Sequence, residues 1–126
     1  GTATTPPASG LGVLPTPAQA PRFQPAQLEQ TARTYYGLLP DDTTAAWQYL
    51  GAAEHAQGFQ RYNDFWSGIN RVSIRGPVAV RGNTVLVNLV FEPTNRQRTF
   101  ERYRLAMGTA PDGRVLINSA ALIGTS

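Results

Sequence analysis

Four side chains of this sequence have the types needed for proton transfer at an apolar substrate: Tyr35, Tyr36, Asp64 and Glu101. Such chemistry needs a carboxylate that accepts a proton and a hydrogen-bond donor that stabilises the developing negative charge, both inside an apolar cavity. Either tyrosine could be the donor and either carboxylate the base. The four residues match no catalytic motif, so the alternative that the tyrosines are core or rim aromatics stays open.

Composition restricts the chemistry of histidine and cysteine. The 126 residues include one histidine, His55, and no cysteine. The lack of cysteine excludes disulfides, thiolate nucleophiles and cysteine-ligated zinc. One histidine without a nucleophile motif supports neither a Ser-His-Asp triad nor a dedicated zinc site. We therefore expect no metal and no cofactor, and we expect His55 to be exposed in a loop or frayed helix end over residues 52–58.

Aromatic side chains could form a binding site instead of a catalytic one. At helix and strand spacing most of them are expected in the core, but two or three could line a cavity that suits an apolar ligand. The candidates for this lining are Tyr36, Trp47, Tyr62, Trp66 and Tyr103. We also expect Trp47 and Trp66 to be buried anchors, because each lies on the apolar stripe of its helix.

The most unusual local feature is a series of arginines at alternate positions. All 11 basic residues are arginine, and the formal net charge is +3. Alternate residues of a strand share a face. This predicts a basic sheet face carrying Arg96, Arg98, Arg102 and Arg104, with Arg71 and Arg75 beside them. Arginine binds carboxylate or phosphate bidentately, which favours an anion- or partner-binding surface. The alternative is a solvated face that prevents self-pairing of an exposed sheet.

The chain divides into two parts by composition. Six of the ten prolines fall in the first 25 residues, so residues 1–21 are predicted to be a Pro/Thr/Ala-rich linker and residues 22–126 the folded domain. No run of about 18 apolar residues is present that would span a membrane. The helices predicted below hold only Arg33 and Arg61, so no basic recognition helix for sequence-specific DNA is expected.

The elements that position these residues follow from hydrophobic spacing. Apolar residues at three- and four-residue intervals predict helices that begin at Pro25, at Asp41 or Asp42, and at Phe59. From residue 70 the period becomes two, which predicts strands over 72–80 (interrupted at 76–77), 85–92, 97–109 and 114–123. The turn signals 81–83 and 111–113 separate them. The expected fold is therefore α+β, with three N-terminal helices packed on a four-stranded antiparallel meander.

Three stretches have a characteristic aromatic spacing: Tyr35-Tyr36-Gly37-Leu38-Leu39-Pro40, Ala45-Ala46-Trp47, and Tyr62-x-x-Phe65-Trp66-x-x-Ile69 followed by Val72. In these stretches the chain resembles the small cone-shaped domains of the nuclear transport factor 2-like superfamily, also called cystatin-like or ketosteroid-isomerase-like. More narrowly, it resembles extracytoplasmic modules of actinobacterial membrane proteins such as receptor-like serine/threonine kinases. The resemblance covers residues 23–123, and it implies a curved sheet around the helices with a pocket at the wide end.

The resemblance implies two kinds of function. The first is a non-catalytic extracytoplasmic sensor or ligand-binding module, tethered through its linker to a membrane protein such as a receptor-like kinase. The second is a stand-alone enzyme of the ketosteroid isomerase, cyclase or dehydratase type, acting on an apolar ring substrate. Asp64 or Glu101 buried beside Tyr35, Tyr36 or Tyr62 would favour the enzyme. A closed or purely apolar cavity would favour the module. The expected partners are a small apolar ligand, an anionic cell-surface component or a second copy bound through the sheet face.

Overall fold

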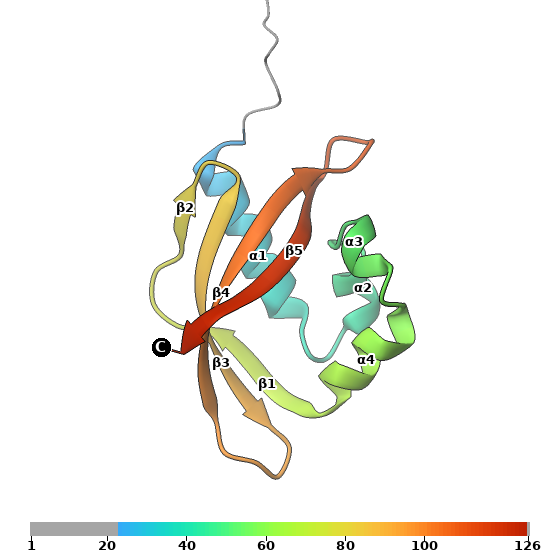
Figure 1. Ribbon diagram of the computed structural model, residues 1–126, viewed down its shortest axis with the longest axis vertical. Helices are drawn as coiled ribbons and strands as arrows, with labels where there is room; N and C mark the ends of the chain where they lie inside the picture. Colours follow the sequence, from blue (N-terminus) through green and yellow to red (C-terminus); the bar gives the residue numbers. More distant parts are fainter. Residues whose placement is uncertain (1–22, 126) are drawn as a thin grey trace, which may run out of the picture.

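The computed structural model describes residues 23–125, which form helices followed by an antiparallel open sheet (Figure 1). The predicted α+β class is confirmed. The predicted linker over residues 1–21 lies outside the described residues. Within residues 23–125 there are four helices and five strands, whereas three and four were predicted.

Both differences in the element count have local causes. A short helix, α3 (Ala52–His55), occupies the segment that was predicted to be a loop or frayed helix end. The predicted first strand is two strands, β1 (Ile69–Ile74) and β2 (Ala79–Arg81). They are separated at the predicted interruption, where Gly76 has a φ of 72°. That left-handed backbone suits glycine and cannot continue a strand.

The three predicted helices are present. Helix α1 (Pro25–Leu38) begins with proline at its first position and is followed by the cis peptide bond Leu39–Pro40. Helix α2 (Thr43–Trp47) is capped by Asp42, whose Oδ1 accepts a hydrogen bond from the backbone nitrogen of Ala45 at 3.0 Å. This capping bond satisfies one of the backbone donors that a helix N-terminus leaves free. Helix α4 (Phe59–Ser67) leads directly into β1.

The long strands are β3 (Thr84–Pro93), β4 (Thr99–Thr109) and β5 (Val115–Thr125). The sheet order is β1-β3-β4-β5, and β2 also pairs with β3. Both predicted turns are confirmed, with Gly82 (φ 57°) between β2 and β3 and Gly113 (φ 91°) between β4 and β5. All pairings are antiparallel, so the strands form a meander as expected.

The core lies between α1 and one face of the sheet. Helix α1 contacts β1, β2, β3 and β5, and Figure 1 shows the long strands crossing it. Alternate residues of β3 are buried, as the two-residue period predicts. The largest fully buried side chains come from the helix and from three strands: Leu28, Leu89, Leu105, Ile117, Val85 and Val87. The face of β3 and β4 that carries these side chains is called the inner face below, and the opposite one the outer face.

The predicted aromatic anchors fare differently. Trp66 is 6% exposed and belongs to the core, as predicted. Trp47 is only half-buried and packs against the core from its edge, so its placement as a fully buried anchor is wrong. Phe65 lies on the predicted apolar stripe of its helix, yet it is 55% exposed. Helix α4 packs against β1 and α2, and this packing leaves the Phe65 side of the stripe largely uncovered.

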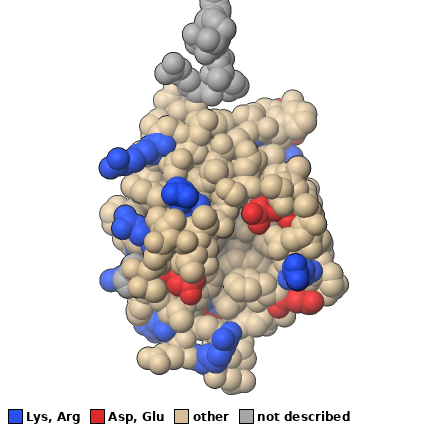
Figure 2. All heavy atoms as spheres, in the orientation of Figure 1, with Lys and Arg blue, Asp and Glu red and all other residues tan. Residues whose placement is uncertain are grey.

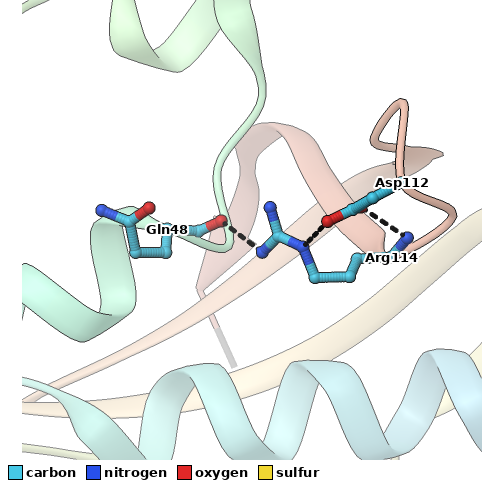
Figure 3. A network of polar contacts seen from close by, with 3 residues as sticks. All are labelled: Gln48, Asp112 and Arg114. Atoms are coloured by element: carbon cyan, nitrogen blue, oxygen red, sulfur yellow. Dashed lines mark hydrogen bonds and ion pairs between the residues drawn. The ribbon is translucent and has the colours of Figure 1, made fainter.

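A polar network ties the turn between β4 and β5 to the end of α2 (Figure 3). Asp112 accepts two hydrogen bonds from Arg114, one from the backbone nitrogen at 3.1 Å and one from Nε at 2.9 Å. Arg114 Nη1 also donates to the backbone oxygen of Gln48 at 3.4 Å. The bonds from Arg114 hold the pKa of the Asp112 carboxyl below its usual value. The network links two segments that are far apart in the sequence.

Candidate functional site

A cavity of about 230 Å³ lies between three helices and the inner face of the sheet. We call it the tyrosine cavity, and its lining comprises Tyr35, Tyr36, Glu54, Gln57, Tyr62, Phe65, Trp66, Phe91, Tyr103 and Ala120. Figure 2 shows a hollow in this face of the molecule, with acidic side chains on both sides of it. Four of the five residues predicted to line a ligand site are brought together here, and the fifth, Trp47, is not among them.

The aromatic wall of the cavity comes from α4 and the inner face of the sheet. Tyr62 and Trp66 are four residues apart on α4, so they share one side of that helix. The Trp66 ring stacks on Phe91 of β3, with ring centroids 5.9 Å apart. Phe91 in turn packs against Tyr103 of β4, at 6.1 Å. The wall is therefore continuous from helix to sheet.

Two hydrogen bonds fix three of the four tyrosine hydroxyls of the cavity, those of Tyr35, Tyr62 and Tyr103. The hydroxyls of Tyr35 and Tyr62 lie 2.8 Å apart and form a buried hydrogen bond in which either can donate. The Tyr103 hydroxyl donates to Glu101 Oε1 at 2.9 Å. In the first pair the hydroxyl that accepts keeps its own proton, and both tyrosines line the cavity. The cavity therefore provides a hydrogen-bond donor within a largely aromatic wall.

Burial keeps the tyrosines of the cavity neutral. It raises the pKa of Tyr62 and of Tyr103 to about 12. The pKa values of Tyr35 and Tyr36 lie higher still, again mainly because burial disfavours the phenolate. At neutral pH all four hydroxyls are protonated, so they act as hydrogen-bond donors and do not add negative charge.

Glu54 is a carboxylate of the cavity that the sequence analysis missed. It is half-buried on α3, and its Oε1 accepts a hydrogen bond from Gln57 Nε2 at 3.2 Å. The nearby Glu54 charge is one of the causes that raise the pKa of Tyr35, Tyr36 and Tyr62, which places these phenols within its electrostatic reach. No local motif marks this glutamate, because only the docking of α3 on the sheet brings it to the cavity.

Backbone bonds to β5 hold α3 in this place. The Ile117 nitrogen donates to the Tyr49 oxygen at 2.7 Å, and the Gly51 nitrogen donates to the Ile117 oxygen at 2.9 Å. A Cβ atom at position 51 would collide with the side chain of Asn118. Glycine therefore permits the close approach that starts α3 against the sheet and directs Glu54 to the cavity.

The two carboxylates nominated for proton transfer lie elsewhere. Asp64 is exposed on α4, where Oδ1 accepts a hydrogen bond from Gln60 Nε2 at 2.8 Å. Glu101 is half-buried and bonds to Tyr103 and to Thr99 Oγ1, the latter at 3.2 Å. It lines a neighbouring pocket of about 240 Å³ that shares Phe65, Phe91 and Tyr103 with the tyrosine cavity. The structure does not bring either carboxylate beside Tyr35 or Tyr36.

His55 is exposed at the end of α3, in agreement with its predicted exposure. Its Nε2 lies 2.8 Å from the backbone oxygen of Trp47, and its ring stacks on the Trp47 ring with centroids 4.4 Å apart. Trp47 also packs on Tyr62, at 4.9 Å. His55 is therefore joined to Tyr62 through Trp47, and neither His55 nor Trp47 lines the cavity itself. Within the described range no group of three or more His, Cys, Asp or Glu side chains is placed to hold a metal ion.

The predicted arginine face is only partly formed. Arg102 and Arg104 lie on the outer face of β4, opposite Asn88 and Leu86 of β3. Arg71 pairs with Glu92 across β1 and β3. The guanidinium carbon of Arg75 lies 5.0 Å from the ring centroid of Phe100, which has the same parity as Arg102.

Arg96 and Arg98 do not belong to this face. Strand β4 begins at Thr99, so both residues lie in the loop after β3, where Asn95 has a φ of 61°. Arg96 instead lines the pocket that contains Glu101. We therefore define the outer arginine face as Arg71, Arg75, Arg102 and Arg104. Ion pairs in the described part of the chain join Arg33 to Glu29 and Arg114 to Asp112, so these four arginines have no carboxylate within 4.0 Å there.

A larger hollow of about 530 Å³ lies between α1, α2 and the β4–β5 turn. Its charged residue is Arg114, which already bonds to Asp112 and Gln48 in the network of Figure 3. The charged group of this hollow is therefore already hydrogen-bonded, which makes the hollow a weaker candidate than the tyrosine cavity. None of the helices within residues 23–125 is long and apolar enough to cross a membrane.

Comparison with known proteins gives no family for this chain. No protein-family model matches it, and no curated protein matches its sequence significantly.

Proposed function

We propose that this chain is a non-catalytic ligand-binding module of the nuclear transport factor 2-like type, with the tyrosine cavity as its binding site. One observation carries the proposal: aromatic walls and neutral tyrosine hydroxyls line a cavity that accounts for four of the five predicted ligand-binding residues. Binding sites for small molecules are commonly apolar with a few polar groups that orient the ligand. The ligand would be small, because the cavity measures about 230 Å³.

The module would act outside the cytoplasm, tethered to a membrane protein such as a receptor-like serine/threonine kinase. Support for this part is the resemblance in the aromatic spacing together with the proline-rich composition of residues 1–21. In such an arrangement ligand binding or dimerisation outside changes the effective concentration of the tethered parts inside. The catalytic step would then belong to another domain.

The binding function can be tested with a pair of matched variants. Ala120 lines the cavity, while Ala121 is its neighbour on β5, pairing with outward-facing Arg104. Ala120→Phe should obstruct the cavity and abolish binding of small aromatic probes such as phenol and indole, measured by calorimetry and tryptophan fluorescence. Ala121→Phe should leave binding unchanged. Binding that is absent from the wild type, or equal in both variants, would refute the proposal.

Proton-transfer catalysis is a second candidate, because Glu54 places a carboxylate in a cavity with tyrosine donors. This version replaces the nominated bases Asp64 and Glu101 by Glu54. It predicts that a cyclic ketone incubated in deuterated water exchanges its α-hydrogens faster with the wild type than with Glu54→Gln. The module predicts no acceleration by either protein. Nuclear magnetic resonance of the recovered ketone distinguishes the two.

The outer arginine face provides a second binding surface, and we propose an anionic polymer as its partner. Its four arginines lack carboxylate partners in the described region, and guanidinium groups bind phosphate or carboxylate oxygens well. Glu92 beside Arg71 is the main acidic residue on this side. Self-association through the face is the alternative outcome, and sedimentation at low and high salt distinguishes it from polymer binding.

A further inference from the structure

The charges around the tyrosine cavity indicate which ligands it would select. Glu54 lies in the cavity wall, and its hydrogen-bond partner there is the neutral amide of Gln57. A second carboxylate, Glu101, is bonded to Tyr103 of the same wall but lies in the neighbouring pocket together with Arg96, so Glu54 is the carboxylate that lines the cavity. No arginine lines the cavity. The site is therefore negative although the whole chain is positive.

The aromatic rings reinforce this preference. The planes of Phe65 and Trp66 are 88° apart, and those of Phe91 and Tyr103 are 57° apart, so the rings present faces in different directions. The face of an aromatic ring carries the negative part of its quadrupole and attracts cations. A cation that touches the face of one of these rings would gain from that face and from Glu54 at once.

Within residues 23–125 no arginine or histidine lines the tyrosine cavity itself, and Arg96 lines the neighbouring pocket. The tyrosine hydroxyls are neutral at physiological pH, and the histidine of the chain stacks on Trp47 behind the cavity. An anionic ligand would meet Glu54 without a compensating cation. A neutral ligand would gain only apolar contacts and a hydrogen bond from a tyrosine hydroxyl.

We propose that the tyrosine cavity binds a small organic cation, a quaternary or protonated ammonium group on an apolar body, with the charge between Glu54 and the aromatic rings. The inference rests on the proposed binding function and specifies its ligand class. The volume of about 230 Å³ favours a compact ammonium over a long polyamine.

The test compares two probes of nearly equal shape, choline and its neutral carbon isostere 3,3-dimethylbutan-1-ol, in calorimetric titrations of the folded chain. We expect choline to bind about tenfold more tightly, as a cation–π contact and a partly buried ion pair together contribute on the order of one factor of ten. Glu54→Gln should remove the ion-pair part of that advantage, leave the smaller cation–π part, and leave the affinity for the alcohol unchanged. Asp64→Asn removes the same charge from exposed α4 and should change neither affinity.

The outcomes separate this inference from the function it rests on. Equal affinities of the two probes for the wild type would overturn the cation preference while the binding function stands. The same holds if aromatic probes bind and neither of these two does. If no probe of either set binds, the binding function itself is refuted. The wild-type comparison decides the matter even if Glu54→Gln were to unfold.

Discussion

The two faces of strands β3 and β4 differ in whether their polar side chains have partners within the protein. On the inner face the hydroxyl of Tyr103 bonds to Glu101, and deeper in the core Tyr35 bonds to Tyr62. On the outer face Arg102 and Arg104 have no carboxylate partner in the described residues. Buried polar groups must be paired because water is excluded, whereas exposed guanidinium groups are satisfied by water and salt ions. The hydrogen bonds of the inner face are thus required for folding. The arginines of the outer face keep a charge that is available to a partner.

Removal of Trp66 should have the largest effect, because its ring joins α4 to the inner face. Trp66→Ala is expected to lower the free energy of unfolding by about 3–5 kcal/mol. Phe65→Ala, at the adjacent and exposed position, should lower it far less. Urea unfolding followed by circular dichroism measures both. Similar losses for the two variants would show that Trp66 is not the anchor of the helix.

Alkaline pH should weaken the inner face next most strongly. The pKa of Tyr62 is about 12 in the folded chain and about 10 when unfolded, so the neutral form is favoured by folding. This contribution is fully present below pH 10 and is lost as the pH rises towards 12, with a size on the order of 2 kcal/mol. Unfolding curves recorded with tyrosinate absorbance measure it. Ionisation of all five tyrosines near pH 10 in a folded chain would contradict the prediction.

The buried hydroxyl pair should contribute less than Trp66 and about as much as the alkaline effect. Tyr35→Phe or Tyr62→Phe leaves one hydroxyl without its partner, at a cost of about 1–3 kcal/mol. The double variant should cost less than the sum of the singles, because no orphaned hydroxyl remains. Thermal unfolding of the four proteins completes the cycle. Additive losses would show that the 2.8 Å contact is not a stabilising hydrogen bond.

The outer face should show almost no effect on stability. Arg102→Glu combined with Arg104→Glu is expected to change the free energy of unfolding by about 0.5 kcal/mol or less. The same variant should lose binding to polyphosphate, which in the wild type weakens as salt is added. Arg61→Glu, exposed on α4, is the control and should retain binding. Salt-independent binding, or none by the wild type, would leave the face as solvated surface.

Local periodicity was enough to predict most of the fold. The alternation of Val85, Val87, Leu89 and Phe91 placed the inner face, and Arg102 and Arg104 followed on the outer face of the paired strand. These predictions hold because a strand turns successive side chains to opposite sides whatever its surroundings. The glycine turns were equally local, since their backbone conformation excludes other residues in most cases.

The membership of the cavity was only partly predictable. Tyr36, Tyr62, Trp66 and Tyr103 were expected because large aromatics lie on the apolar faces of their elements. Arg96 and Arg98 were misplaced. Side chains alternate between the two faces only within a strand, and β4 begins at Thr99 and not at the predicted residue 97. The exposure of Phe65 was not predicted, because the spacing of a helical stripe does not reveal how much of that stripe the rest of the fold covers.

The sequence by itself determined which residues alternate, where the turns fall and which faces are apolar, because these depend on backbone geometry over a few residues. Only the tertiary structure decided that Glu54 lies among tyrosines. Its position depends on the backbone bonds of Ile117 with Tyr49 and Gly51, the latter 66 residues away in sequence. A contact over that distance is selected by the packing of the whole domain, and no local pattern in residues 52–58 records it.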